Sequence, residues 1–125
     1  RIGNMGKTIM IVEDEQAFHD LYTMMLEDTD YDIVRAYDGD EALAKLEEKK
    51  PDLIILDILL DLVTGDTFFL YIKGMPEYSD IPVIICSSFS QKAYKNLKDM
   101  DPDLVFLEKP FTKEKMIEEI TAKIG

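Results

Sequence analysis

The stretch DLIILDILLDLVTG, residues 52–65, places a single carboxylate, Asp57, inside an apolar run. The flanking residues, Leu53–Leu56 and Ile58, form a continuous apolar segment that is too short for a helix. Such a segment is typical of a parallel strand that is buried on both faces. An unpaired buried carboxylate is energetically costly, so we expect Asp57 to meet a cation, hydrogen-bond donors or solvent at the strand end.

Similar apolar runs recur along the chain, separated by segments with helical periodicity. The predicted strands are Thr8–Val12, Tyr31–Tyr37, Leu53–Leu56, Ile81–Cys86 and Leu104–Leu107, with the alternating Tyr31–Tyr37 nearer an edge. The predicted helices are Glu15–Asp28, Gly39–Lys49, a segment after Gly65, Ser90–Met100 and a segment after Thr112, a plausible N-cap. This alternation predicts an α/β fold of (βα)5 type, a doubly wound five-stranded parallel sheet covered by helices on both faces.

The chain of 125 residues has the length of one domain and is strongly acidic. Its 14 Lys and Arg against 26 Asp and Glu give a formal net charge of −12, which repels phosphate backbones, so we expect no nucleic-acid binding by this domain. No apolar run approaches the roughly 18 residues of a membrane span, so we expect no membrane partner. The single cysteine, Cys86, is expected in the core, and its lack of an intrachain disulfide partner fits a cytoplasmic protein.

Polar residues stand where four of the predicted strands end. They are Glu13, Asp14, Asp57, Ser87, Ser88, Glu108 and Lys109. In an open α/β sheet the ligand site lies outside the carboxyl ends of the strands, so these side chains are expected to converge on one crevice. Crowded carboxylates repel one another unless a cation neutralises them, and oxygen ligands without His or Cys indicate Mg²⁺. The lysine and the serine would then contact phosphoryl oxygens opposite the metal.

The order and spacing of these motifs resemble the receiver domain of two-component response regulators. The resemblance covers residues 7–125 and rests on IVEDE at 11–15, AYDGDEAL at 36–43, LIILDILL at 53–60, Gly65, PVIICSS at 82–88 and FLEKPF at 106–111. It implies a flavodoxin-like receiver fold. Residues 1–6 are then expected to be a disordered N-terminal extension or a cloning remnant.

The resemblance also implies a role for each matching residue. Asp57 would be the nucleophile that accepts a phosphoryl group, and Lys109 would pair with Asp57 and then with the phosphoryl oxygens. Ser87 would hydrogen-bond the attached group, and Phe106 would follow Ser87 as the second switch residue. The implied Mg²⁺ ligands are Glu13, Asp14, Asp57 and the backbone carbonyl of Leu59. The Lys109–Pro110 peptide bond would be cis.

The function implied is a phosphorylatable signalling switch of a two-component or phosphorelay system. It would be a regulatory phosphoacceptor rather than an enzyme, although it would take part in its own phosphorylation and dephosphorylation. A histidine kinase or a histidine phosphotransfer protein would supply the phosphoryl group. The sequence does not define the output partner or a fused effector domain.

Other functions fit the sequence less well. A Mg²⁺-dependent phosphohydrolase of the haloacid dehalogenase type would need a second acid two residues after the nucleophile, where this chain has Leu59. A pseudo-receiver that acts only as an interaction module would lack the acceptor, an acid or the lysine, and none is missing. The apolar face predicted for the first helix consists of Phe18, Leu21, Tyr22, Met25 and Leu26. His19, one residue from this face, is interpreted as an ordinary surface histidine and not as a phosphoryl carrier.

Two positions near the predicted site depart from the common pattern of the family. Asp61 stands where proline is common, and Ser88 where alanine or glycine is common. Neither change removes a reacting group, but Asp61 adds negative charge beside the site. Leu59 and Phe89 would flank the path of an attacking water, and their apolar side chains predict a long-lived phosphoryl group.

Overall fold

Five parallel strands form a single sheet in the computed structural model, which describes residues 6–58, 63–87 and 95–125. The strands are β1 (Thr8–Val12), β2 (Asp32–Ala36), β3 (Leu53–Ile58), β4 (Val83–Ser87) and β5 (Val105–Glu108). Their spatial order is β2-β1-β3-β4-β5, and every neighbouring pair is parallel. The predicted α/β class and the edge position of the alternating strand β2 are therefore confirmed.

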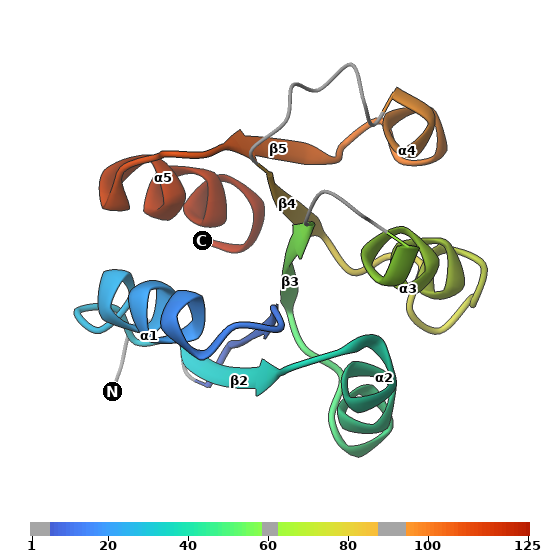
Figure 1. The fold of residues 1–125 in the computed structure, drawn as a ribbon, viewed down its shortest axis with the longest axis horizontal. Coiled ribbons are helices and arrows are strands. Elements are labelled where there is room, and N and C mark those ends of the chain that lie inside the picture. Colours follow the sequence, from blue (N-terminus) through green and yellow to red (C-terminus); the bar gives the residue numbers. More distant parts are fainter. Residues whose placement is uncertain (1–5, 59–62, 88–94) are drawn as a thin grey trace.

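The helices alternate with the strands and cover both faces of the sheet. They are α1 (Gln16–Met25), α2 (Gly39–Glu48), α3 (Val63–Lys73), α4 (Lys95–Met100) and α5 (Lys113–Ile124). Figure 1 shows α1 and α5 on one face and α2, α3 and α4 on the other, which is the doubly wound arrangement. Among the helices, two predicted limits differ by more than one residue: α1 ends at Met25 rather than at Asp28, and α3 begins at Val63, ahead of Gly65.

Two helices begin at side chains that cap their first turn. Asp38 accepts a hydrogen bond from the Glu41 amide over 2.7 Å at the start of α2. Thr112 accepts one from the Lys115 amide over 3.0 Å at the start of α5, which confirms its predicted role as an N-cap. Each cap satisfies an amide that has no partner within its own helix, and so fixes where the helix starts.

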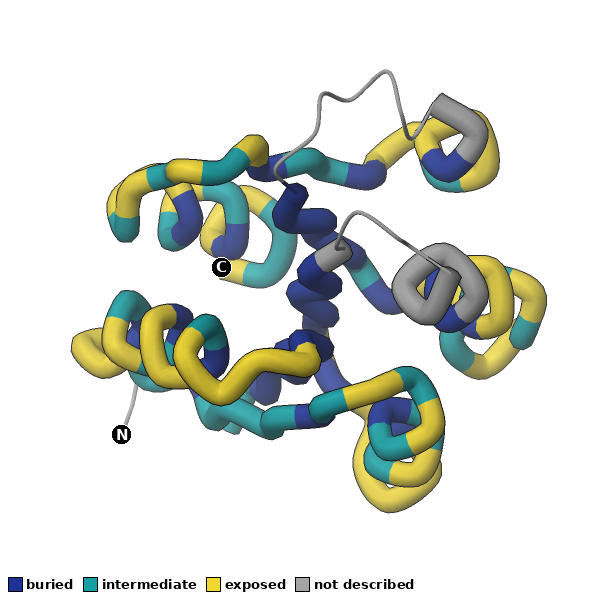
Figure 2. The backbone as a smooth tube through the Cα atoms, viewed as in Figure 1, coloured by how far each residue is buried: buried dark blue, intermediate teal, exposed yellow. Residues whose placement is uncertain are grey.

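The core consists of two apolar layers, one on each face of the sheet. Figure 2 shows the central strands as the most buried part of the chain, with helices exposed on their outer sides. The layer beneath α1 and α5 includes Ile55, Cys86 and Met116, and the layer beneath α2, α3 and α4 includes Leu56, Ile85 and Phe69. Every residue of β1 and β4 is buried, as expected for parallel strands covered on both sides. The core position predicted for Cys86 is confirmed.

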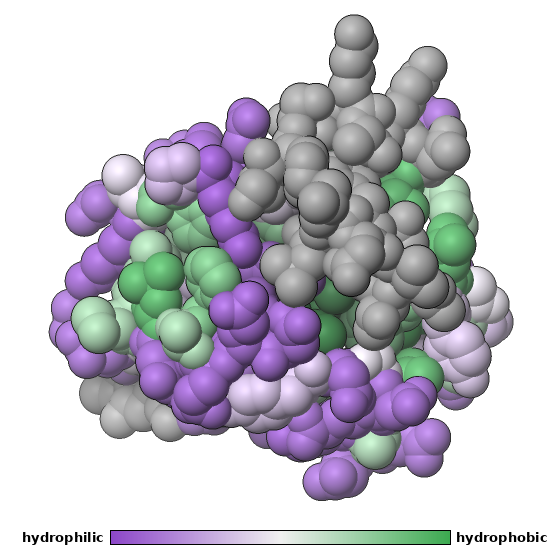
Figure 3. All heavy atoms as spheres, viewed as in Figure 1, coloured by the Kyte–Doolittle hydropathy of each residue, from purple (hydrophilic) through white to green (hydrophobic). Residues whose placement is uncertain are grey.

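Hydrophilic residues cover much of the visible part of the face drawn in Figure 3, and hydrophobic residues are exposed between them. The exposed apolar side chains of α1 are Leu21 and Met24, which are 40% and 60% exposed. None of the helices in the described ranges is long and apolar enough to cross a membrane. Several predicted features lie outside the described residues. They are Leu59, Asp61, Ser88, Phe89, the predicted helix start at Ser90 and residues 1–5 of the expected N-terminal extension.

Candidate functional site

The register of the sheet brings the predicted site residues to one edge. Val12 of β1 pairs with Leu56 of β3. Because the two strands are parallel, the residues that follow this pair, Glu13 and Asp57, also lie next to each other. The strand order reverses between these two strands, which is where ligands bind in open α/β sheets. On the other side, the Lys109 amide donates to the Ser87 carbonyl oxygen over 2.7 Å, which extends the β4–β5 pairing.

Asp57 has its charge balanced inside the fold. Its side chain is fully buried. The Lys109 ammonium lies 2.6 Å from Oδ2 and 2.8 Å from Oδ1, and the Tyr22 hydroxyl donates to Oδ2 over 2.5 Å. The cation and the hydroxyl together compensate for the loss of water around the carboxylate. Of the three outcomes that the sequence left open for Asp57, the structure selects a cation and a hydrogen bond.

Lys109 is held in place by its backbone and by its side chain. The amide hydrogen bond to Ser87 fixes its backbone, and the Lys109–Pro110 peptide bond is cis, as the resemblance implied. The ammonium also lies 4.0 Å from the centre of the Phe18 ring, within the range of a cation–π interaction. Because the lysine side chain is only 14% exposed, its charge reaches Asp57 with little screening by solvent.

Glu13 is the second buried acid of the site, at 2% exposure. Its Oε2 accepts a hydrogen bond from the Glu15 amide over 2.8 Å, whereas its buried Oε1 has no hydrogen-bond partner in the described part of the chain. Burial raises the pKa of Glu13 to about 9, with further upward contributions from the neighbouring Asp57 and Asp14 carboxyl groups. Two crowded carboxyl groups and an oxygen without a donor are a fitting environment for a cation.

The predicted metal ligands are brought together only in part. Glu13 and Asp57 are buried side by side, whereas Asp14, the residue after Glu13, is exposed. Among residues 6–58, 63–87 and 95–125, no three or more His, Cys, Asp or Glu side chains are already placed around a common metal position. The fourth predicted ligand, the carbonyl of Leu59, lies outside the described residues. The donor set nevertheless fits Mg²⁺, because it consists of oxygen atoms and because Oε1 of Glu13 lacks a hydrogen-bond partner within the described ranges.

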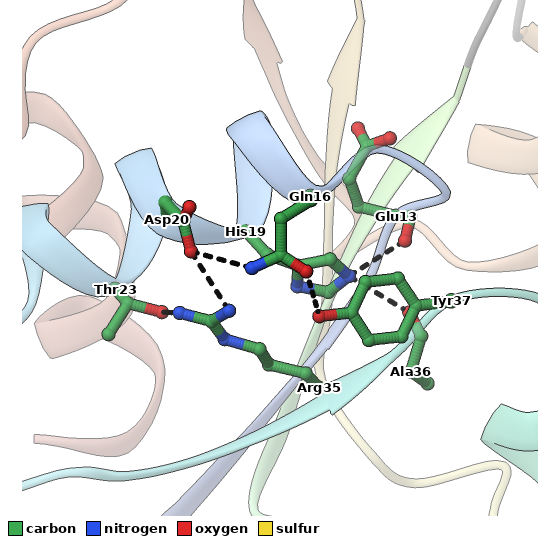
Figure 4. A network of polar contacts seen from close by, with 8 residues as sticks. All are labelled: Glu13, Gln16, His19, Asp20, Thr23, Arg35, Ala36 and Tyr37. Atoms are coloured by element: carbon green, nitrogen blue, oxygen red, sulfur yellow. Dashed lines mark hydrogen bonds and ion pairs between the residues drawn. The ribbon is translucent and has the colours of Figure 1, made fainter.

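His19 contradicts its interpretation as a surface histidine, because it is 0% exposed. Its Nε2 lies 2.7 Å from the carbonyl oxygen of Glu13 and 3.2 Å from that of Ala36, and its ring centre lies 4.3 Å from that of Tyr37 (Figure 4). Both oxygens are acceptors, so Nε2 carries the hydrogen. The position is buried because α1 packs over the loop after β1 and over the end of β2, and helical periodicity alone does not show this.

Helix α1 therefore supports the site with three contacts that could not be read from its helical periodicity. Phe18 lies under the Lys109 ammonium, His19 holds the Glu13 carbonyl, and Tyr22 donates to Asp57. Phe18 and Tyr22 were assigned to the apolar face, but nothing in the periodicity indicated that they contact polar groups. The helix is also rotated from the predicted face, since Leu21 is exposed. The signal that could have found this face is the spacing of ring side chains at i, i+1 and i+4.

The two predicted switch residues lie on one face of the sheet. Phe106 pairs in register with Ile85, and Ser87 follows Ile85 by two residues, so all three side chains project to the side of α2, α3 and α4. Ser87 is buried at 2% exposure, and Phe106 is partly buried against the core layer on that side. The two residues therefore lie on neighbouring strands and on the same face of the sheet.

The sequence of this chain matches the response regulator receiver domain family over residues 9–121. Two similar proteins are the polar-differentiation response regulators DivK of Brucella anthropi and Brucella ovis. Each is 32% identical over 121 residues, which cover 97% of this chain and 98% of the relative. These alignments extend over nearly the whole of both chains.

Solved structures give the same result. A chemotaxis protein CheY4 of Vibrio cholerae superposes with a TM-score of 0.83 at 24% identity, over 94% of this chain and 98% of the other, which supports the fold. The signal receiver domain of a putative LuxO repressor protein from Vibrio parahaemolyticus superposes with a TM-score of 0.81 at 29% identity, over 95% and 90% of the two chains. From its fold, the geometry of its strand ends and these matches, the chain belongs to the response regulator receiver domain family of two-component signalling.

Proposed function

We propose that Asp57 accepts a phosphoryl group from a phosphohistidine and that the resulting charge change is passed to a partner. The observation that carries this proposal is the placement of the Asp57 carboxylate, which is fully buried and paired with Lys109 at the carboxyl end of β3. In the transfer, an Asp57 oxygen bonds to phosphorus while the bond from phosphorus to the histidine nitrogen breaks. The electron pair of that bond stays on the imidazole of the donor.

Lys109 would keep its charge close to the reacting oxygens throughout the transfer. It contacts both carboxylate oxygens, so it can turn to the phosphoryl oxygens without leaving the site. A fixed cation that faces developing negative charge stabilises the transition state of phosphoryl transfer. The contact with Phe18 supports this role because it restricts where the ammonium can move.

The chemistry also requires a divalent cation to neutralise the phosphoryl oxygens, and bound Mg²⁺ would supply it. Glu13, Asp14, Asp57 and the Leu59 carbonyl would hold the ion. Two features of buried Glu13 support this assignment. Its Oε1 has no hydrogen-bond partner among the described residues, and burial together with two neighbouring carboxyl groups raises its pKa. A cation at this point would let Glu13 ionise.

Ser87 and Phe106 would carry the signal away from the site. Ser87 would move to hydrogen-bond the attached phosphoryl group, and Phe106 would rotate into the space that is freed. Their common side of the sheet and their neighbouring strands support this coupling. The surface affected lies over α4, β5 and α5, and it would present different side chains to an output partner in the two states.

A histidine kinase or a histidine phosphotransfer protein is the partner implied by this chemistry, and such a relay would operate in the cytoplasm. The protein would act as a regulatory domain that assists its own phosphorylation and dephosphorylation. A phosphohydrolase of the haloacid dehalogenase type is disfavoured by the identity of residue 59, which is leucine rather than an acid.

The proposal is tested by phosphorylation with acetyl phosphate and Mg²⁺, followed by intact-protein mass spectrometry. The wild-type protein should gain one phosphoryl group, and Asp57→Asn should gain none, because asparagine keeps the shape but loses the nucleophilic oxygen. Asp52→Asn is a matched control, since Asp52 accepts a hydrogen bond from the Thr8 amide at the opposite end of β3. Equal labelling of D57N and the wild-type protein would overturn the proposal and direct attention to Asp61.

The switch has a separate test. Ser87→Ala should still accept the phosphoryl group but should show smaller NMR shift changes at Phe106 on phosphorylation than the wild-type protein. Unchanged shifts around Phe106 in the phosphorylated wild-type protein would refute the relay while leaving the acceptor assignment intact.

A further inference from the structure

The hydroxyl of Tyr22 is a polar group buried directly against the proposed acceptor, and the function proposed above gives it no role. Tyr22 is 1% exposed, and its hydroxyl donates to Oδ2 of Asp57 over 2.5 Å. The carboxylate oxygen of Asp57 is an acceptor, so the phenol is the donor of this hydrogen bond.

Packing holds this hydroxyl in place. The Tyr22 ring stacks on Phe111, with ring centres 6.1 Å apart and planes 14° from parallel, and its centre lies 6.2 Å from that of Phe18. The residue belongs to the apolar layer between the sheet and helices α1 and α5. A phenylalanine would fill almost the same space, so the hydroxyl can be removed with little change in packing.

We propose that Tyr22 is a hydrogen-bond donor to the leaving carboxylate when Asp57 loses its phosphoryl group, and that it shortens the lifetime of the phosphorylated state. This inference rests on the proposed function of Asp57. In hydrolysis a water oxygen bonds to phosphorus and the bond from phosphorus to the Asp57 oxygen breaks. The electron pair of that bond stays on the carboxylate, and both water protons leave with the phosphate as H₂PO₄⁻.

The argument depends on how the charge of Asp57 changes during this step. A hydrogen bond to an ionised acceptor is roughly twice as strong as one to a neutral acceptor. Asp57 is a carboxylate before phosphorylation and after hydrolysis, but its oxygens carry much less negative charge while they belong to an acyl phosphate. The Tyr22 hydrogen bond therefore strengthens as the bond to phosphorus breaks, and it favours the unphosphorylated side of the equilibrium.

Tyr22→Phe is the direct test, with Asp57 phosphorylated by acetyl phosphate and Mg²⁺ and the donor then removed. Loss of the hydroxyl should slow the decay of the phosphorylated protein about three- to tenfold, as followed by intact-protein mass spectrometry. The transfer equilibrium with a phosphohistidine donor should shift toward phosphorylated Asp57 by a similar factor. Tyr37→Phe is the matched control, since the Tyr37 hydroxyl donates to Gln16 over 2.9 Å and is not bonded to Asp57. Its decay should equal that of the wild-type protein.

A second variant separates hydrogen bonding from packing. Incorporation of 3-fluorotyrosine at position 22 makes the hydroxyl a stronger donor, so it should speed the decay where Tyr22→Phe slows it. A purely structural role of the ring would not give opposite signs for these two changes. This second measurement also decides the question if Y22F does not fold.

The outcomes for the two proposals are distinct. A wild-type protein that gains no phosphoryl group, or a D57N variant labelled as fully as wild type, would refute the function of Asp57 itself. Normal labelling of Asp57 together with a folded Y22F that decays at the wild-type rate or faster would overturn the role of Tyr22. An unchanged or slower decay with 3-fluorotyrosine would overturn it equally.

Discussion

The Lys109 ammonium lies 2.6 Å from Oδ2 of Asp57, although the two residues are 52 positions apart in the chain. The ion pair joins the end of β3 to the loop after β5 and crosses β4 between them. It is a tertiary contact between two buried groups, so its two partners are expected to respond very differently to substitution.

We expect Lys109→Met to destabilise the protein by about 3 kcal/mol, because it removes the cation that compensates the buried Asp57 carboxylate, while the Tyr22 hydrogen bond is kept. D57N should cost much less, since the long lysine side chain can move its charge toward solvent. Urea unfolding of the two single variants and the double variant measures the coupling. A double variant no more stable than Lys109→Met would contradict this account.

The raised pKa of Glu13 predicts a pH-dependent stability in the absence of Mg²⁺. A carboxyl group whose folded pKa lies above its unfolded value stabilises the fold fully below about pH 4.5, and this contribution is lost as the pH rises toward about 9. The glutamine of Glu13→Gln cannot ionise, so this variant does not lose the contribution. Its free energy of unfolding, relative to that of the wild-type protein, should therefore rise by on the order of 2 kcal/mol from pH 5 to pH 8.

Glu15→Gln, a change of the exposed acid two residues away, serves as the control and should show no such trend. Millimolar Mg²⁺ should make the wild-type protein more stable than Glu13→Gln, since only the wild-type protein can offer the Glu13 carboxylate to the ion. Thermal melts at the two pH values with and without Mg²⁺ provide the measurement. A pH-independent difference between E13Q and the wild-type protein would show that Glu13 is ionised in the fold.

His19→Phe should destabilise the protein by about 1–3 kcal/mol, because the carbonyl of Glu13 loses the buried donor that now contacts it. The Glu13 amide, which donates to the Ala36 carbonyl over 3.0 Å, should also exchange its hydrogen faster. Gln16→Ala removes surface hydrogen bonds from the same helix and should leave that exchange rate unchanged. Hydrogen exchange followed by NMR measures the exchange rate of the Glu13 amide in both variants. Equal protection of this amide in H19F and the wild-type protein would count against the role of His19.

A second buried ion pair lies outside the site. Lys73 at the end of α3 reaches Asp101 over 3.1 Å, with exposures of 8% and 16%, and also donates to the carbonyls of Ser79 and Ile81. Lys73→Met should therefore cost about 2–4 kcal/mol in urea unfolding. Lys50→Met breaks an exposed pair with Asp80 and should cause no resolvable change. Similar losses in the two variants would show that burial does not set the strength of these pairs.

Much of this architecture could be predicted from the sequence, because the apolar runs are short, continuous and regularly separated by helical segments. Thr8–Val12 was predicted with the limits of β1, and the other strands within a few residues. Once the strands are parallel and in one sheet, the residues that follow them must meet at one edge. Glu13, Asp57, Ser87 and Lys109 were therefore identified as neighbours without coordinates.

Only the tertiary structure decided what surrounds those residues. Periodicity defines an apolar face of α1 but not the rotation of that helix on the sheet, so Leu21 was expected inside and His19 outside, and the reverse holds. The hydrogen bond of Tyr22 could not be predicted either. The ring of Tyr22 fits an apolar face, but its hydroxyl needs a polar partner, which only the packed fold supplies. The sequence determined which groups meet at the strand ends, and packing of α1 against the sheet determined which of them are bonded to one another.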